Sequence, residues 1–152
     1  MIASLLAALL LQTAAPACTE TARPPAGLET WSTVSAISTA SVEPGKTTGV
    51  QLSPADKVKF ALPPERQPAA GSFAGVYQVT VSKAGTYRVA LEAGAWIDVV
   101  RDGKSLTSVA HMEGPACSGI RKIVDFELVP GSYTLQLSGA KVETMRVLIA
   151  PK

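Results

Sequence analysis

A single segment of this chain gathers most of the residue types that could do chemistry. Residues 108–122 hold His111, the only histidine, together with Glu113, Cys117 and Arg121. Irregular segments carry functional side chains more often than the strands that they connect. We therefore expect a functional site to include this stretch.

Cys117 and His111 suggest two kinds of catalysis. A thiolate beside an imidazole would be a nucleophile, because the imidazole can take the proton of the thiol. Glu113 follows His111 at the spacing found in zinc deaminases, but those enzymes need a Cys-x-x-Cys pair to complete the ligands of the metal. The chain has only one other cysteine, Cys18. We therefore predict no metal site and no cofactor.

Hydroxyl and carboxylate side chains allow two further arrangements. Ser108 or Ser118 could join the histidine and an aspartate, Asp98 or Asp125, in a triad. The Gly-x-Ser-x-Gly motif that exposes such a serine on a sharp turn is missing from the sequence. Asp125 and Glu127 lie in phase on one predicted strand, and we interpret them as a solvent-exposed edge and not as a glycosidase pair. A non-catalytic protein is the favoured prediction, and an enzyme with a site around the histidine is the alternative.

Trp96 provides the best binding hypothesis. An indole ring stacks on sugar rings and other planar groups, and its N–H needs a hydrogen-bond partner. Charged side chains close to it in sequence or in the predicted fold would orient a ligand. The predicted ligand-binding residues are Trp96, Asp98, Arg101, His111 and Arg121. The expected partner is a small molecule, a glycan or an envelope protein, and a purely structural role in the envelope is a further alternative.

The phase of the strand that begins at Trp96 decides which side chains face the core. Side chains alternate along a strand, so Trp96 and Asp98 share one face, while Ile97 and Val99 share the other. We favour Ile97 and Val99 in the core, because the opposite choice would bury an aspartate. Trp31 is predicted to be a core residue.

The N-terminus indicates export. Residues 1–17 form a run of apolar and small residues that ends in Ala-Pro-Ala, which is typical of a signal peptide cleaved after a small residue. Cleavage after Ala17 would make Cys18 the first residue of a periplasmic or secreted protein. Lipidation of Cys18 is the alternative, although Pro16 does not suit such a site.

Export predicts a disulfide. Cys18 and Cys117 are the only cysteines, and in an oxidising compartment they are each other's natural partner. The bond would attach an extended Pro-rich leader, residues 18–30, to the loop that contains Cys117. Cys18 is the only obvious tether of that leader, because the leader has few apolar residues.

Composition excludes several classes of protein. The formal net charge of the 152 residues is +2, which gives no electrostatic footprint for nucleic acid. No apolar run is long enough to span a membrane as a helix, because such a helix needs about 20 residues. About 135 residues remain after cleavage, enough for one domain over residues 31–152.

Frequent turn residues and apolar alternation predict an all-β, antiparallel, jelly-roll-like β-sandwich of about eight to ten short strands. Asp102-Gly103 suits a type I′ turn, so we expect residues 97–101 and 104–110 to pair. The alternation implies that each strand has one buried face and one wet face. Arg88, Ala90, Glu92, Thr134, Gln136 and Ser138 fall on wet faces. The predicted strands are residues 31–38, 49–53, 57–62, 74–82, 86–92, 96–101, 105–110, 122–128, 132–138 and 142–149.

Two segments of similar sequence support the same fold. Residues 79–91 and 126–137 each read as a strand, a glycine turn and a tyrosine that opens the return strand. The pattern resembles the last hairpins of bacterial pre-peptidase C-terminal domains and of carbohydrate-binding-like jelly rolls. Residues 94–104 and 108–126 also resemble short exported bacterial proteins of uncharacterised function, some of which carry the label homogentisate 1,2-dioxygenase. That label implies an iron site with two histidines and a carboxylate, whereas this chain has one histidine.

Overall fold

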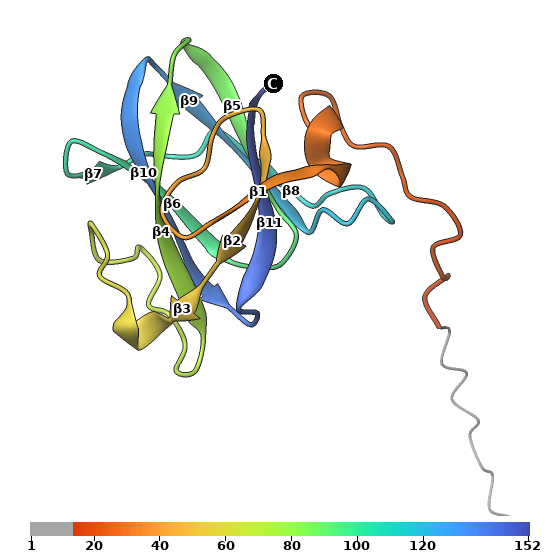
Figure 1. Ribbon diagram of the computed structural model, residues 1–152, viewed down its shortest axis with the longest axis horizontal. Helices are drawn as coiled ribbons and strands as arrows, with labels where there is room; N and C mark the ends of the chain where they lie inside the picture. The colour runs from red at the N-terminus through yellow and green to blue at the C-terminus, as the bar shows by residue number, and fades with distance from the viewer. Residues whose placement is uncertain (1–13) are drawn as a thin grey trace, which may run out of the picture.

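Two β-sheets pack face to face in the computed structural model, which describes residues 14–152 (Figure 1). Most of the predicted signal peptide, residues 1–13, lies outside the described residues. The first sheet has the order β1 (Val34–Ser38), β2 (Thr47–Gln51), β11 (Thr144–Pro151), β5 (Gly85–Leu91), β9 (Lys122–Leu128) and β8 (Ala110–Met112). The second has the order β3 (Ser53–Pro54), β4 (Phe73–Val81), β10 (Gly131–Ala140), β6 (Trp96–Arg101) and β7 (Lys104–Ser105). The predicted all-β sandwich is confirmed.

Alternating apolar residues of both sheets form the main core. Inward side chains such as Val89 of β5, Val99 of β6, Phe126 of β9 and Leu135 of β10 are buried in one cluster. The pairs are antiparallel except β1 with β2, which is parallel. No helix of residues 14–152 is both long and apolar enough to cross a membrane.

The two similar segments join different sheets and are not hairpins. The first connects β4 of the second sheet to β5 of the first, and the other connects β9 of the first sheet to β10 of the second. Each tyrosine donates a hydrogen bond to the carbonyl four residues before it: Tyr87 to Lys83 at 2.8 Å and Tyr133 to Val129 at 2.7 Å. This is the arrangement of a tyrosine corner, which stabilises a chain that turns from one sheet into the other. The sequence repeat therefore encodes a recurring corner.

The outer face of the first sheet is covered by the N-terminal segment, drawn in orange in Figure 1. Leu28 and Trp31, the latter within the short 3-10 helix η1 (Glu29–Ser32), are fully buried against Ala90, Ile123 and Leu148. Trp31 is thus a core residue as predicted, but in a second core outside the sandwich. The expectation that Cys18 is the only tether of the leader was wrong, because Leu28 within the leader and Trp31 directly after it are also buried against this sheet.

Covering this face also buries charge. Arg88, predicted to face water, is buried; its Nε lies 3.3 Å from Asp125 Oδ1 and its Nη1 donates to Ala26 O at 3.2 Å. Asp125 is fully buried, and Lys152 Nζ lies 3.2 Å from its second oxygen. The prediction of a solvent-exposed edge at Asp125 was therefore wrong, because the leader lies over it.

A second covering segment lies on the outer face of the other sheet. Residues 55–72, which begin with the 3-10 helix η2 (Ala55–Lys57), run without forming a strand (yellow in Figure 1). Residues 57–62, which were predicted to form a strand, form none, and the side chain of Gln136 of β10 makes hydrogen bonds to their backbone. Its side-chain amide accepts from the N–H of Ala61 and Leu62 at 2.7 and 3.2 Å and donates to Leu62 O at 3.1 Å. Gln136 and Ser138 are consequently buried and not wet.

The predicted hairpin at Asp102-Gly103 is confirmed only at its tip. Asp102 and Gly103 have φ of 50° and 70°, which a type I′ turn requires. Pairing with β6 then stops at Ser105, after Val100 and Arg101 have been paired. The N–H of Leu106 makes a last hydrogen bond to Val99 O at 2.8 Å. Residues 107–109 then cross to the first sheet, where Ala110–Met112 forms edge strand β8.

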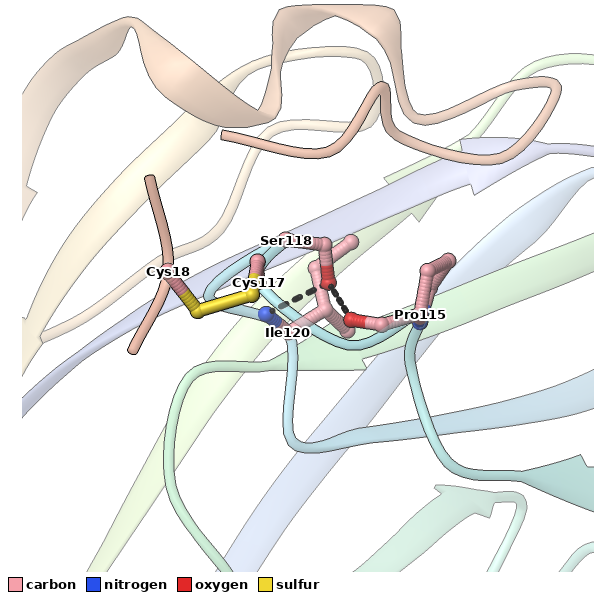
Figure 2. Close-up of a disulfide and its surroundings, with 5 residues drawn as sticks. All are labelled: Cys18, Pro115, Cys117, Ser118 and Ile120. Atoms are coloured by element: carbon pink, nitrogen blue, oxygen red, sulfur yellow. Dashed lines mark hydrogen bonds between the residues drawn. A yellow bond between two sulfur atoms is a disulfide. The ribbon is translucent and has the colours of Figure 1, made fainter. Parts of the chain in front are cut away.

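The disulfide joins Cys18 to Cys117, with Cα atoms 5.5 Å apart (Figure 2). Cys117 sits in a tight turn with φ of 64°. Ser118 stabilises that turn, because its hydroxyl donates to Pro115 O at 2.6 Å and accepts from the N–H of Ile120 at 3.1 Å. The predicted pairing is confirmed, and a lipid thioether at Cys18 is incompatible with it because the same sulfur forms the bond.

Candidate functional site

A cleft of about 580 Å³ opens where the two sheets separate beside β6 and β9. We call it the inter-sheet cleft. Its floor is apolar and includes the core side chains of Ile97, Val124 and Phe126. Its rim is polar or charged and comprises Glu65, Trp96, Ser105, Thr107, Ser108, His111 and Lys122.

The fold explains why the core is reachable here. β7 has only two residues, so the second sheet ends early beside β6. The chain between β7 and β8 then crosses from one sheet to the other and forms one wall of the cleft with Leu106 and Thr107. β9 forms the opposite wall, with Lys122 in phase with Val124 and Phe126 because side chains alternate.

Lys122 and Trp96 meet at the rim. Lys122 Nζ lies 5.4 Å from the centroid of the indole ring and donates a hydrogen bond to Ala95 O at 3.0 Å. A cation over an aromatic face is attracted by the electron density of the ring. Burial lowers the pKa of Lys122, and the charge of Arg66 lowers it further. One face of Trp96 is therefore already covered, which leaves its other face and its edges for a ligand.

Asp98 orients the indole ring of Trp96 through a hydrogen bond. Its Oδ1 accepts the indole N–H at 3.0 Å, and its Oδ2 accepts the backbone N–H of Glu65 at 3.4 Å. Ile97 and Val99 face the core, as expected, yet Asp98 is also buried. The reasoning that an outward Asp98 would be exposed was wrong, because residues 55–72 cover the outer face. Asp98 is thus a positioning residue that does not line the cleft.

The five residues selected from the sequence are only partly brought together. Trp96 and His111, the latter exposed on β8, line the inter-sheet cleft. Arg101 lies at the other end of β6, where its Nη1 donates to the Tyr133 hydroxyl at 2.9 Å. Arg121 points into solvent and pairs with Glu113 at 2.7 Å. Neither arginine lines the cleft.

Two of the catalytic arrangements considered from the sequence meet structural obstacles. Cys117 has no thiolate, because its sulfur is bonded to Cys18. The Ser118 hydroxyl is engaged with the turn around the disulfide, and Asp125 is buried beneath the leader with Arg88. Within residues 14–152, no three side chains of His, Cys, Asp or Glu converge on a point where a metal could bind.

Sequence reasoning missed two charged residues of the rim, Glu65 and Lys122. Lys122 was detectable, because it is in phase with Val124 and Phe126 at the start of β9 and must face the sandwich interior. Glu65 was not, because it belongs to an irregular segment whose position depends on a side chain of β10, Gln136.

No protein-family model matches the chain, and searches of curated proteins and of solved structures found no significant match. The resemblances drawn from the sequence therefore stay expectations.

Proposed function

We propose that this protein is an exported, non-catalytic binding protein that takes a small, partly apolar molecule into the inter-sheet cleft. The observation that carries the proposal is an apolar floor of core side chains beneath a rim of polar ones. Such a combination is typical of small-molecule sites, where apolar area supplies affinity and a few polar groups fix orientation. The volume of about 580 Å³ falls within the range of about 300 to 1,000 Å³ that such sites occupy.

The rim favours a ligand with hydrogen-bonding groups at one end. His111 can donate or accept, Glu65 accepts and Lys122 donates, so both kinds of partner are offered. The apolar body would lie against Phe126, Val124 and Ile97, where burial removes its surface from water. This supports a small molecule over a glycan, because the stacking face of Trp96 is shared with Lys122.

The disulfide supports the exported part of the proposal. Bonds such as Cys18–Cys117 persist in oxidising compartments and are rare in the cytosol. Mass spectrometry of the protein from its native cell tests this directly. A chain that begins at Cys18 and contains no free thiol is expected, and an intact chain with two free thiols in the cytosol would contradict it.

A fragment screen followed by two-dimensional NMR tests the cleft. Small aromatic and aliphatic fragments should shift the amide signals of residues 105–111 and 122–126, and the indole N–H of Trp96. Trp96→Ala and His111→Ala should weaken binding about tenfold or more, because each removes a contact to the bound molecule. Arg121→Ala is the matched control, because it removes a charge from the same end of the protein outside the cleft.

The control variant distinguishes a loss of binding at the inter-sheet cleft from a general effect of a substitution at this end of the protein. Binding that survives Trp96→Ala and His111→Ala, or falls equally in Arg121→Ala, would remove the inter-sheet cleft as the site. Unfolding temperatures of all three variants should be compared first, so that a loss of folding is not read as a loss of binding.

A further inference from the structure

A second cleft lies on the other side of the Lys122 and Trp96 pair. It has a volume of about 630 Å³ and is bounded by Lys122 and by residues 66–69, 93–96, 138–139 and 141–142. Three cations line it: Arg66 from the segment over the second sheet, Lys122 at the start of β9, and Lys141 between β10 and β11. We call it the cationic cleft.

The charges of this cleft are not compensated. No aspartate or glutamate lines it. Within residues 14–152, none of the three cations makes an ion pair, whereas the nearby Glu92 is committed to Arg146 at 2.9 Å. Like charges held together raise the free energy of the empty site, and a bound anion would relieve that repulsion.

The lowered pKa of Lys122 agrees with uncompensated positive charge in the cationic cleft. Burial lowers the pKa of its ammonium group, and repulsion from Arg66 lowers it further. Arg66 is therefore close enough for its charge to act on Lys122, although the two come from segments far apart in the sequence. An anion bound between the two cations would offset the repulsion from Arg66 and raise the pKa of Lys122 again.

Ser138 supplies a second, independent observation. It lines the same cleft, is 1 % exposed, and its hydroxyl has no hydrogen-bond partner within the described part of the chain. Buried hydroxyls are almost always paired. Trp96, directly opposite Ser138 in the β6 and β10 register, adds an aromatic wall.

We propose that the cationic cleft binds the phosphate or sulfate group of a small organic ligand. Up to three cationic groups would surround the oxyanion, and charge-assisted hydrogen bonds of this kind are among the strongest that a protein makes. The remaining volume accommodates the organic part beside Trp96. This site goes beyond the proposed function, because the cleft and its expected ligand group differ from those of the inter-sheet cleft.

Inorganic phosphate is a suitable probe, since it tests the oxyanion site without knowledge of the full ligand. In an NMR titration at constant ionic strength, phosphate should cause saturable shifts of residues 66–69, 93–96 and 139–142, while residues 105–111 stay unchanged. Sulfate should produce the same pattern. Phosphate shifts that do not saturate, or that sodium chloride reproduces, would overturn the proposal.

Variants identify the cations responsible. Arg66→Gln and Lys141→Gln should each weaken phosphate binding about tenfold, the effect of losing one hydrogen bond to a charged group. Lys104→Gln is the matched control, because Lys104 is an exposed cation at the start of β7, beside the far end of β6. An equal loss in Lys104→Gln would indicate general charge attraction and reject the site.

The experiments distinguish a failure of the oxyanion site from a failure of the proposed function at the inter-sheet cleft. His111→Ala should leave phosphate binding unchanged, because His111 does not line the cationic cleft. If fragments shift residues 105–111 and phosphate shifts nothing, the oxyanion site fails alone. If phosphate binds and no fragment does, the proposed function fails alone.

Discussion

Lys122 Nζ lies 5.4 Å above the centroid of the Trp96 ring, and this pair stands between two clefts. The two residues come from strands of different sheets, β9 and β6. Asp98 holds the indole through its N–H, and Ala95 O holds the ammonium group. Each member of the pair is thus held by a hydrogen bond, and the pair separates the two clefts at this end of the sandwich.

Replacing Lys122 should reveal the cost of burying its charge. Burial, and then the charge of Arg66, lower the pKa of Lys122 in the folded state below 10.5. At pH values between this lowered pKa and 10.5, the unfolded chain therefore holds more protons than the folded protein does. The wild-type protein thus gains stability over that window. Lys122→Met lacks this gain, so its stability relative to wild type should be highest near neutral pH and decline with rising pH. Urea unfolding at several pH values measures the difference in free energy of unfolding between the variant and wild type. A difference that does not change with pH would contradict a lowered pKa of Lys122.

The side chain of Gln136 should control the order of the segment over the second sheet. Gln136→Leu removes three hydrogen bonds to Ala61 and Leu62, and we expect a loss of about 2 kcal/mol in the free energy of unfolding. Hydrogen exchange at the amides of Ala61 and Leu62 should accelerate, while β10 stays protected. Gln78→Leu, which changes an exposed glutamine of β4, is the control. Unchanged exchange at residues 61 and 62 would contradict the role of Gln136.

The two tyrosine corners should differ in strength. Tyr87→Phe removes one hydrogen bond, to Lys83 O, and should cost about 1 kcal/mol. Tyr133→Phe removes three, to Val129 O, Val129 N and Arg101 Nη1, and should cost about 2 kcal/mol. Chemical denaturation of both variants tests the order, and a larger loss in Tyr87→Phe would show that hydrogen-bond number does not decide it.

Tyr77 should make the protein sensitive to high pH. Burial raises the pKa of its hydroxyl from 10.0 to about 12, and the hydroxyl donates to Gln51 O at 2.6 Å. The contribution is complete below pH 10 and is lost as pH rises toward 12, because the unfolded chain ionises first; two pH units correspond to about 3 kcal/mol. Tyrosinate absorbance should show a late ionisation that Tyr77→Phe lacks. A late step that survives in Tyr77→Phe would assign it to another tyrosine.

Reduction of the disulfide should release only part of the leader. The N–H of Ala22 donates to Cys117 O at 3.0 Å, so its protection from exchange should disappear with the bond. Leu28 and Trp31 should stay docked through their buried side chains. The loss of the link over 99 residues should lower stability by up to about 4.7 kcal/mol in the chain-entropy estimate. Hydrogen exchange of Cys18→Ser measures the loss of protection at Ala22 and the protection that remains around Trp31. Loss of protection at both places together would contradict the anchoring of the leader by Leu28 and Trp31.

The amino-acid sequence by itself determined the all-β class, several of the strands and the disulfide. Trp96–Arg101 and Lys122–Leu128 form strands with the bounds predicted, because period-two alternation and turn residues act locally. Two cysteines allow only one intramolecular pairing, and the structure has it. Trp96 and His111 were identifiable as residue types suited to a site, although their roles in binding stay predictions.

Only the tertiary structure decided what covers the sheets and where the clefts lie. The wet-face predictions failed at Arg88, Asp98 and Gln136, because residues outside the strands lie over them. The position of such a segment depends on contacts with side chains distant in sequence, such as Gln136 with Leu62, and a local pattern does not reveal them. For the same reason, Arg66 and Lys141 look like ordinary surface cations in the sequence, and packing alone brings them to Trp96.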